Sequence, residues 1–136
     1  MYRRYSFISV SAFALLMLLA TGAPLAASDS DSFFTHLHTE KAMANVTISP
    51  GRAGPVDITI QLETVDELPL TAKAVSVTLL DAQSGSDRQT FQATRGTDDQ
   101  WYVQTSMKTP GRWILGLGIS ISETDSVNIE SPILIK

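Results

Sequence analysis

The chain has 136 residues and contains no cysteine. This absence excludes disulfide bonds, thiolate metal sites and thiol redox chemistry, so the stability of the fold has to come from packing alone. Histidine is almost as scarce, with two residues in the whole chain. A hydroxyl nucleophile needs a base beside it, and two neighbouring histidines at one end of the domain give little support for such catalysis. We therefore expect a protein that is not an enzyme.

Positive charge is also sparse. Beyond residue 28 the chain carries eight Lys and Arg residues against fourteen Asp and Glu residues, a net charge of −6, and the basic residues are not clustered. Binding to phosphate backbones needs clustered cationic side chains, so nucleic acid is not expected as a partner. The oligomeric state cannot be inferred from these features.

Residues 1–28 have the features of an export signal. Arg3 and Arg4 precede an uncharged run with an apolar centre, which Gly22 and Pro24 end before a group of small residues. This pattern predicts a signal peptide that forms a helix and is removed near residue 28, leaving the protein periplasmic or secreted. The alternative is an uncleaved membrane anchor, because a run of about twenty residues could span a bilayer.

The rest of the chain is dominated by alternation of apolar and polar residues, the pattern of half-buried strands. Seven strands are expected, which begin near Ala44, Val56, Val75, Phe91, Trp101, Trp113 and Val127. Turn residues separate them, and no helical period occurs after the leader. Pro132 interrupts the last strand and suits an edge position or a bulge.

The fold class predicted is all-β, a seven-stranded antiparallel immunoglobulin-like or cupredoxin-like sandwich. We divide the chain into a signal peptide (1–28), an N-terminal segment that carries the histidines (29–41) and the sandwich domain (42–136). Trp101 and Trp113 are expected to fill the core. The acidic pair Asp98 and Asp99 is expected to serve turn geometry alone.

The two histidines form the one cluster that suggests binding chemistry. On an extended segment, residues two apart project to the same side, so His36 and His38 can converge on one ion. Imidazole suits copper(II), and a thioether from Met43 or Met107 would favour copper(I). Glu40 could add an oxygen ligand. The alternative is that both histidines are solvated side chains near the N-terminus that bind no metal.

Several segments together carry a family resemblance: the stretch from His36 to Val56, Leu70–Val75, Trp101–Val103 and Pro110–Trp113. The chain resembles, from about residue 35 to 135, the extracytoplasmic domain at the C-terminus of bacterial copper-transport membrane proteins of the CopD type, which is related to small secreted YtkA-like modules. The resemblance implies an immunoglobulin-like or cupredoxin-like sandwich outside the cytoplasmic membrane and a role in copper handling.

The chain departs from these relatives in two ways. One leader stands where the fused proteins have a bundle of membrane helices, so transport itself is not implied. The N-terminal histidine and the Asp-Gly-His element of secreted CopC proteins are both missing. We therefore expect a non-enzymatic copper-binding module that exchanges copper with a membrane transporter or a periplasmic copper protein. The alternative is a metal-free interaction domain.

Overall fold

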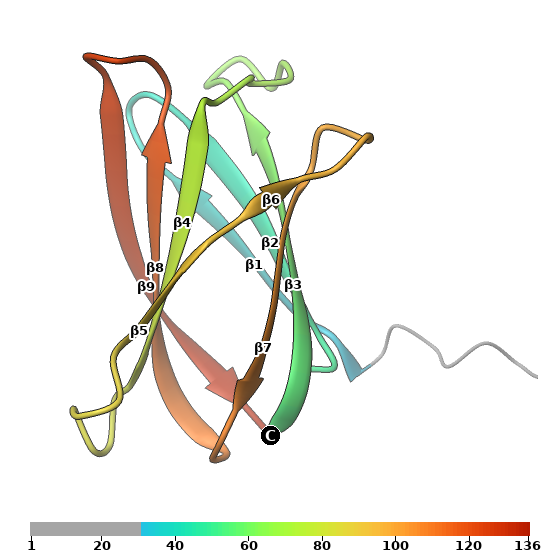
Figure 1. The fold of residues 1–136 in the computed structure, drawn as a ribbon, viewed down its shortest axis with the longest axis vertical. Helices are drawn as coiled ribbons and strands as arrows, with labels where there is room; N and C mark the ends of the chain where they lie inside the picture. Colours follow the sequence, from blue (N-terminus) through green and yellow to red (C-terminus); the bar gives the residue numbers. More distant parts are fainter. Residues whose placement is uncertain (1–30) are drawn as a thin grey trace, which may run out of the picture.

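The computed structural model describes residues 31–136, so the predicted signal peptide lies outside the described residues. These residues form two antiparallel sheets that face each other (Figure 1). The first sheet has the strand order β1-β2-β3-β7-β6 and the second has the order β5-β4-β8-β9. The strands are β1 (Phe33–His38), β2 (Met43–Ser49), β3 (Gly54–Glu63), β4 (Ala74–Asp81), β5 (Gln89–Gln92), β6 (Thr94–Arg95), β7 (Trp101–Met107), β8 (Gly111–Ser120) and β9 (Ser126–Ile135).

The core lies between the two sheets because every second side chain of the long strands points inward. In β3 the inward residues are Val56, Ile58, Ile60 and Leu62, and the residues between them are exposed or half-buried. β4 and β8 contribute matching aliphatic side chains from the other sheet. This burial of apolar surface is the main driving force for folding in a domain without disulfides. The predicted sandwich of two antiparallel sheets is confirmed.

Both predicted core tryptophans are buried, Trp101 at 6% and Trp113 at 3% exposure. The indole Nε1 of Trp113 donates to the backbone carbonyl of Thr109 at 3.0 Å, so its polar atom is satisfied. The pair Asp98 and Asp99 forms the turn before β7, where the Asp98 carboxylate accepts the Gln100 backbone N–H at 3.1 Å. The structural role predicted for that pair is confirmed.

The predicted count of seven strands is wrong, and the structure has nine among the described residues. One additional strand is β1, which pairs along its length with β2 and forms an edge of the first sheet. Residues 33–38, which we placed in the segment ahead of the sandwich, form this strand of the first sheet. The other arises where the chain changes sheets after Gln92, which divides one expected strand into β5 and β6 (Figure 1).

Pro132 lies in β9, which is an edge strand of the second sheet as predicted.

A turn glycine, Gly51, brings three distant segments together near the end of β9. The Gly51 N–H donates to the Asp31 carbonyl, and the Lys136 N–H donates to the Gly51 carbonyl at 3.0 Å. A Cβ at Gly51 would come within 2.8 Å of the Phe33 nitrogen, so only glycine fits there. Within residues 31–136, no helix is long and apolar enough to cross a membrane.

Candidate metal centre

The two histidines stand at the end of β1, where a tight turn connects it to β2. The Thr39 N–H donates to the Ala42 carbonyl at 2.9 Å and closes the turn. The Thr39 hydroxyl accepts the backbone N–H groups of Lys41 and Ala42 at 3.2 and 3.0 Å. These bonds satisfy the turn's own backbone groups, so the last residue of β1 and the first of β2 are held opposite each other.

The alternation of β1 places both histidines on the outer face of the first sheet. Leu37, between them, is 5% exposed and belongs to the core, whereas His36 and His38 are exposed. Their ring centroids lie 6.3 Å apart and the ring planes are inclined by 53°. The structure thus places the two imidazoles side by side, as the spacing predicted, at a separation that one ion between them could bridge.

Met43 is the third member of this group. It lies directly opposite His38 in the β1–β2 register, and directly opposed residues of an antiparallel pair project from the same face. Its neighbour Ala44 points into the core, so Met43 points away from it. Met43 is nevertheless only 5% exposed. The register therefore places Met43 beside His38 on the same face of the sheet.

Met107, the other predicted sulfur ligand, lies elsewhere. It ends β7 opposite Gly54, at the start of β3, whereas Met43 lies opposite Glu63 at the end of β3. Nine residues of extended strand separate these positions, about 30 Å. Met107 is also fully buried in the core between the sheets. The structure does not bring it to the histidines, and we remove it from the site.

Two rows of outward side chains cross β1, β2 and β3 at this end of the sheet. One row consists of His38, Met43 and Glu63, and the next consists of His36, Asn45 and Gln61. Sequence analysis missed Glu63, because only the register reveals that it flanks Met43. Glu40 is exposed in the β1–β2 turn. Among the described residues, no group of three or more His, Cys, Asp and Glu side chains is close enough to hold a metal.

One of the two imidazoles has a defined hydrogen bond. The Nδ1 atom of His36 lies 2.6 Å from the amide oxygen Oδ1 of Asn45, its direct cross-strand partner. An amide oxygen can only accept, so when this bond forms Nδ1 is the nitrogen that carries the hydrogen. The lone pair of the neutral ring is then on Nε2, the atom that remains available to a metal ion.

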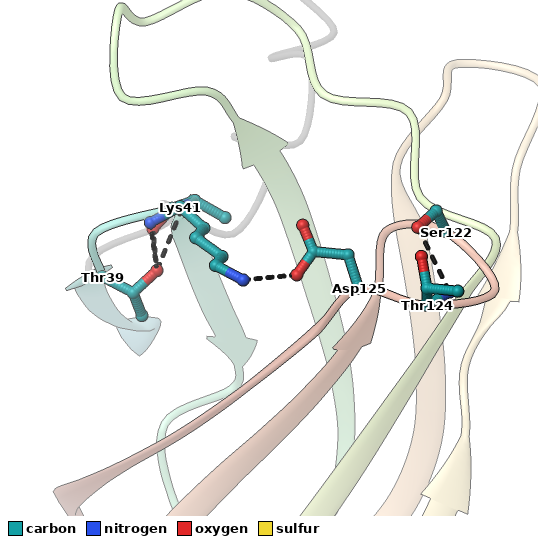
Figure 2. A network of polar contacts seen from close by, with 6 residues as sticks. Thr39, Lys41, Ser122, Thr124 and Asp125 are labelled. Atoms are coloured by element: carbon teal, nitrogen blue, oxygen red, sulfur yellow. Dashed lines mark hydrogen bonds and ion pairs between the residues drawn. The ribbon is translucent and has the colours of Figure 1, made fainter.

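The turn beside the histidines is also attached to the other sheet. The ammonium of Lys41 forms an ion pair with the carboxylate of Asp125 in the β8–β9 loop, at 2.5 Å (Figure 2). In the same loop, the Thr124 N–H donates to the Ser122 hydroxyl at 3.4 Å. Both members of the ion pair are about half exposed, so the pair adds little to stability. It links the hairpin that carries the histidines to the opposite sheet.

Two carboxylates away from the histidines have lowered pKa values. For Asp81 the main cause is the Gln83 backbone N–H, which donates to it at 2.9 Å, and the Thr109 hydroxyl also donates, at 3.1 Å. For Asp98 the main cause is the Tyr102 hydroxyl, and the same bond raises the pKa of Tyr102. Both carboxylates accept bonds that close turns, so these shifts reflect structure rather than catalysis.

The outer face of the first sheet also has a shallow hollow of about 540 Å³, away from the histidines. It is lined by Asp57, Thr59, Thr94, Tyr102, Val103 and Gln104. These side chains are mainly neutral and polar, and none is a nucleophile paired with a base. The hollow does not indicate an enzyme active site.

Comparison with known proteins supports the fold. No family model and no curated protein sequence matches the chain, so the sequence resemblance to CopD-type and YtkA-like domains is not confirmed. Among solved structures, the chain is similar to a copper-bound variant of FetP from uropathogenic Escherichia coli strain F11, with a TM-score of 0.56 and 11% identity over 76% of this chain and 97% of that one. It is also similar to as-isolated FetP of the same strain, recombinantly expressed in the periplasm, with a TM-score of 0.50 and 12% identity over 77% and 97% of the two chains. At these identities the similarity establishes a shared β-sandwich fold.

Proposed function

We propose that this protein is an exported, non-enzymatic β-sandwich that binds copper and handles it outside the cytoplasm. The observation that carries the proposal is the placement of His36, His38 and Met43 together on the outer face at one end of the first sheet. The proposal includes an immunoglobulin-like or cupredoxin-like class for the sandwich and the removal of the predicted leader.

The donor set favours copper over other common metals. Imidazole nitrogen binds copper in both oxidation states, and thioether sulfur favours copper(I). Magnesium and calcium require several oxygen ligands, which two imidazoles and a thioether do not provide. Glu63 beside Met43 is the nearest carboxylate in the row and suits the harder copper(II). A FetP variant with a similar fold is copper-bound in its solved structure. This supports the proposal, which rests on the placement of the two histidines and Met43.

The position of the site suits transfer of copper rather than storage. His36 and His38 are exposed on an edge strand, so an incoming ligand can reach an ion held there from the solvent side. Three protein ligands leave room for a fourth from a partner. We propose that the partner is a membrane copper transporter or a periplasmic copper protein, which donates copper to this chain or accepts it.

A competitive copper titration tests the proposal. The purified protein should bind one copper ion per chain, and the variant His36→Ala/His38→Ala should lose that binding while keeping its denaturation midpoint, because both side chains lie outside the core. Phe34→Ala is a matched control, since Phe34 projects from the same face of β1, is 63% exposed and has no metal-binding atom. Equal copper affinity in the parent and the double variant would refute the site.

A metal-free interaction domain is the second candidate function. The observation that favours it is the exposure of large apolar side chains, among them Phe34 at 63% on β1 and Leu134 at 62% on β9. Both strands are sheet edges, where unpaired backbone groups can bind an added strand. A protein that binds no copper in the titration would favour this function.

A further inference from the structure

We infer that Asn45 is a positioning residue of the metal centre, which selects Nε2 of His36 as the atom that binds copper. The inference rests on the proposed function and specifies which atom performs it. The side chain of Asn45 ends in an amide, which is a poor copper ligand. Asn45 therefore affects copper affinity through the histidine that it touches.

The geometry of the pair brings the imidazole and the amide together. His36 and Asn45 are direct cross-strand partners on the outer face of the β1–β2 hairpin, and their side chains meet at 2.6 Å. The strand pairing fixes the separation of the two backbones, so this contact needs no rearrangement of the sheet. The hairpin is closed three residues farther on by the bonds between Thr39 and Ala42. The strand pairing therefore fixes the position of the His36 backbone, and the amide of Asn45 fixes the orientation of its ring.

The chemistry of the ring connects this hydrogen bond to metal binding. In a neutral imidazole one nitrogen carries the hydrogen and the other carries the lone pair, and a metal binds only at the lone pair. The Asn45 oxygen accepts from Nδ1, which stabilises the tautomer with its lone pair on Nε2. In metal proteins a ligating histidine usually donates its other N–H to an acceptor of this kind, which fixes the ring orientation and raises the basicity of the ligand. The hydrogen bond thus sets the tautomer and the ring orientation of His36 before copper binds.

The position of Asn45 in its row allows substitutions that change the hydrogen bond alone. Asn45 stands between His36 on β1 and Gln61 on β3, one row from His38, Met43 and Glu63. An apolar residue at position 45 would keep the strand but leave His36 Nδ1 to water. An aspartate would keep an acceptor oxygen in the same place. These two substitutions separate the hydrogen bond from the packing of the side chain.

The experiment combines a measurement without metal and one with metal. Long-range nitrogen–proton NMR spectra of the metal-free protein should show His36 with its hydrogen on Nδ1. Asn45→Leu should shift the His36 population toward the other tautomer and lower copper affinity by about 10–100-fold, the usual effect of losing such a partner. Asn45→Asp should retain both properties. Thr47→Val is the control, because Thr47 projects from the same face of β2 and lies opposite Phe34.

The results distinguish this inference from the proposed function. If the parent binds copper and Asn45→Leu binds it equally well, the inference is wrong and the function stands. If the parent binds no copper, the proposed function fails and the role of Asn45 at the site fails with it. A parent protein with the hydrogen of His36 on Nε2 would overturn the inference even if the leucine variant did not fold.

Discussion

Met43 and Met107 have the same side chain and similar burial but opposite surroundings. Met43 is 5% exposed beside His38 on the outer face, and Met107 is fully buried among core residues at the other end of the sheet. Exposure alone cannot distinguish them. The strand register does, because it gives the face and the end of the sheet at which each side chain lies.

Substitution of the two methionines should therefore have different effects. Among residues 31–136, Met43 is the one methionine that the register places beside the histidines, so Met43→Leu should weaken copper(I) binding by more than tenfold, or about 1.4 kcal/mol. Copper(II) binding should change less, because imidazole remains. Met107→Leu conserves volume in the core and should leave copper(I) affinity unchanged. A competition assay with a copper(I) chelator measures both, and equal losses in the two variants would contradict the assignment of Met43.

Asp81 is the one buried charged residue of the described chain, at 8% exposure. Its carboxylate accepts the Gln83 N–H and the Thr109 hydroxyl, and these bonds lower its pKa in the folded protein. A proton therefore binds more readily to Asp81 in the unfolded chain than in the folded one. The stability that the carboxylate contributes is present above its ordinary value of 3.8 and is lost as pH falls through the lowered folded pKa.

Replacing this carboxylate should alter the acid sensitivity of the fold. Asp81→Asn should destabilise the protein at neutral pH and should reduce the further loss of stability between about pH 5 and pH 2. Chemical denaturation at several pH values measures both effects. If the parent and the variant lose stability in parallel over that range, Asp81 is not responsible for the acid sensitivity.

At the scale of single elements, regular alternation made most strands predictable. β3, β4 and β8 have aliphatic residues at every second position, and sequence analysis found them. β1 was missed because its alternation is broken: Thr35 faces inward, whereas Phe34 faces outward and is 63% exposed. β5 and β6 are short, and the change of sheet between them depends on contacts that no local pattern encodes.

β8 should be the element most sensitive to core truncation. It pairs with β4 and β9, and Trp113 lies between Asp81 and Ile133 in that register. Trp113→Ala should cost about 3–5 kcal/mol, a large part of the 5–15 kcal/mol typical of a domain. Leu134→Ala in β9 is the control, because an exposed side chain should change stability by no more than about 0.5 kcal/mol. A denaturation midpoint that Trp113→Ala leaves unchanged would show that the indole does not stabilise the core.

At the scale of the whole molecule, the sequence supported the all-β class, the two-layer arrangement and the pairing of the histidines. It could not identify which methionine joins them, because His38 and Met43 meet only through the β1–β2 register and Met107 is excluded only by the arrangement of β3 and β7. Asn45 and Glu63 could not be identified from a local motif either, because they lie on β2 and β3 and reach the histidines only through strand pairing. Export and removal of residues 1–28 stay predictions, since those residues lie outside the described part.

The proposed copper site consists of two exposed imidazoles and the thioether of Met43 at one end of the first sheet. X-ray absorption of the copper-loaded protein tests this account most directly, since it identifies the ligand atoms themselves. The account predicts two imidazole nitrogens bound to copper and, in the copper(I) form, one thioether sulfur as well. A copper environment without imidazole, or a protein that does not retain copper, would contradict it.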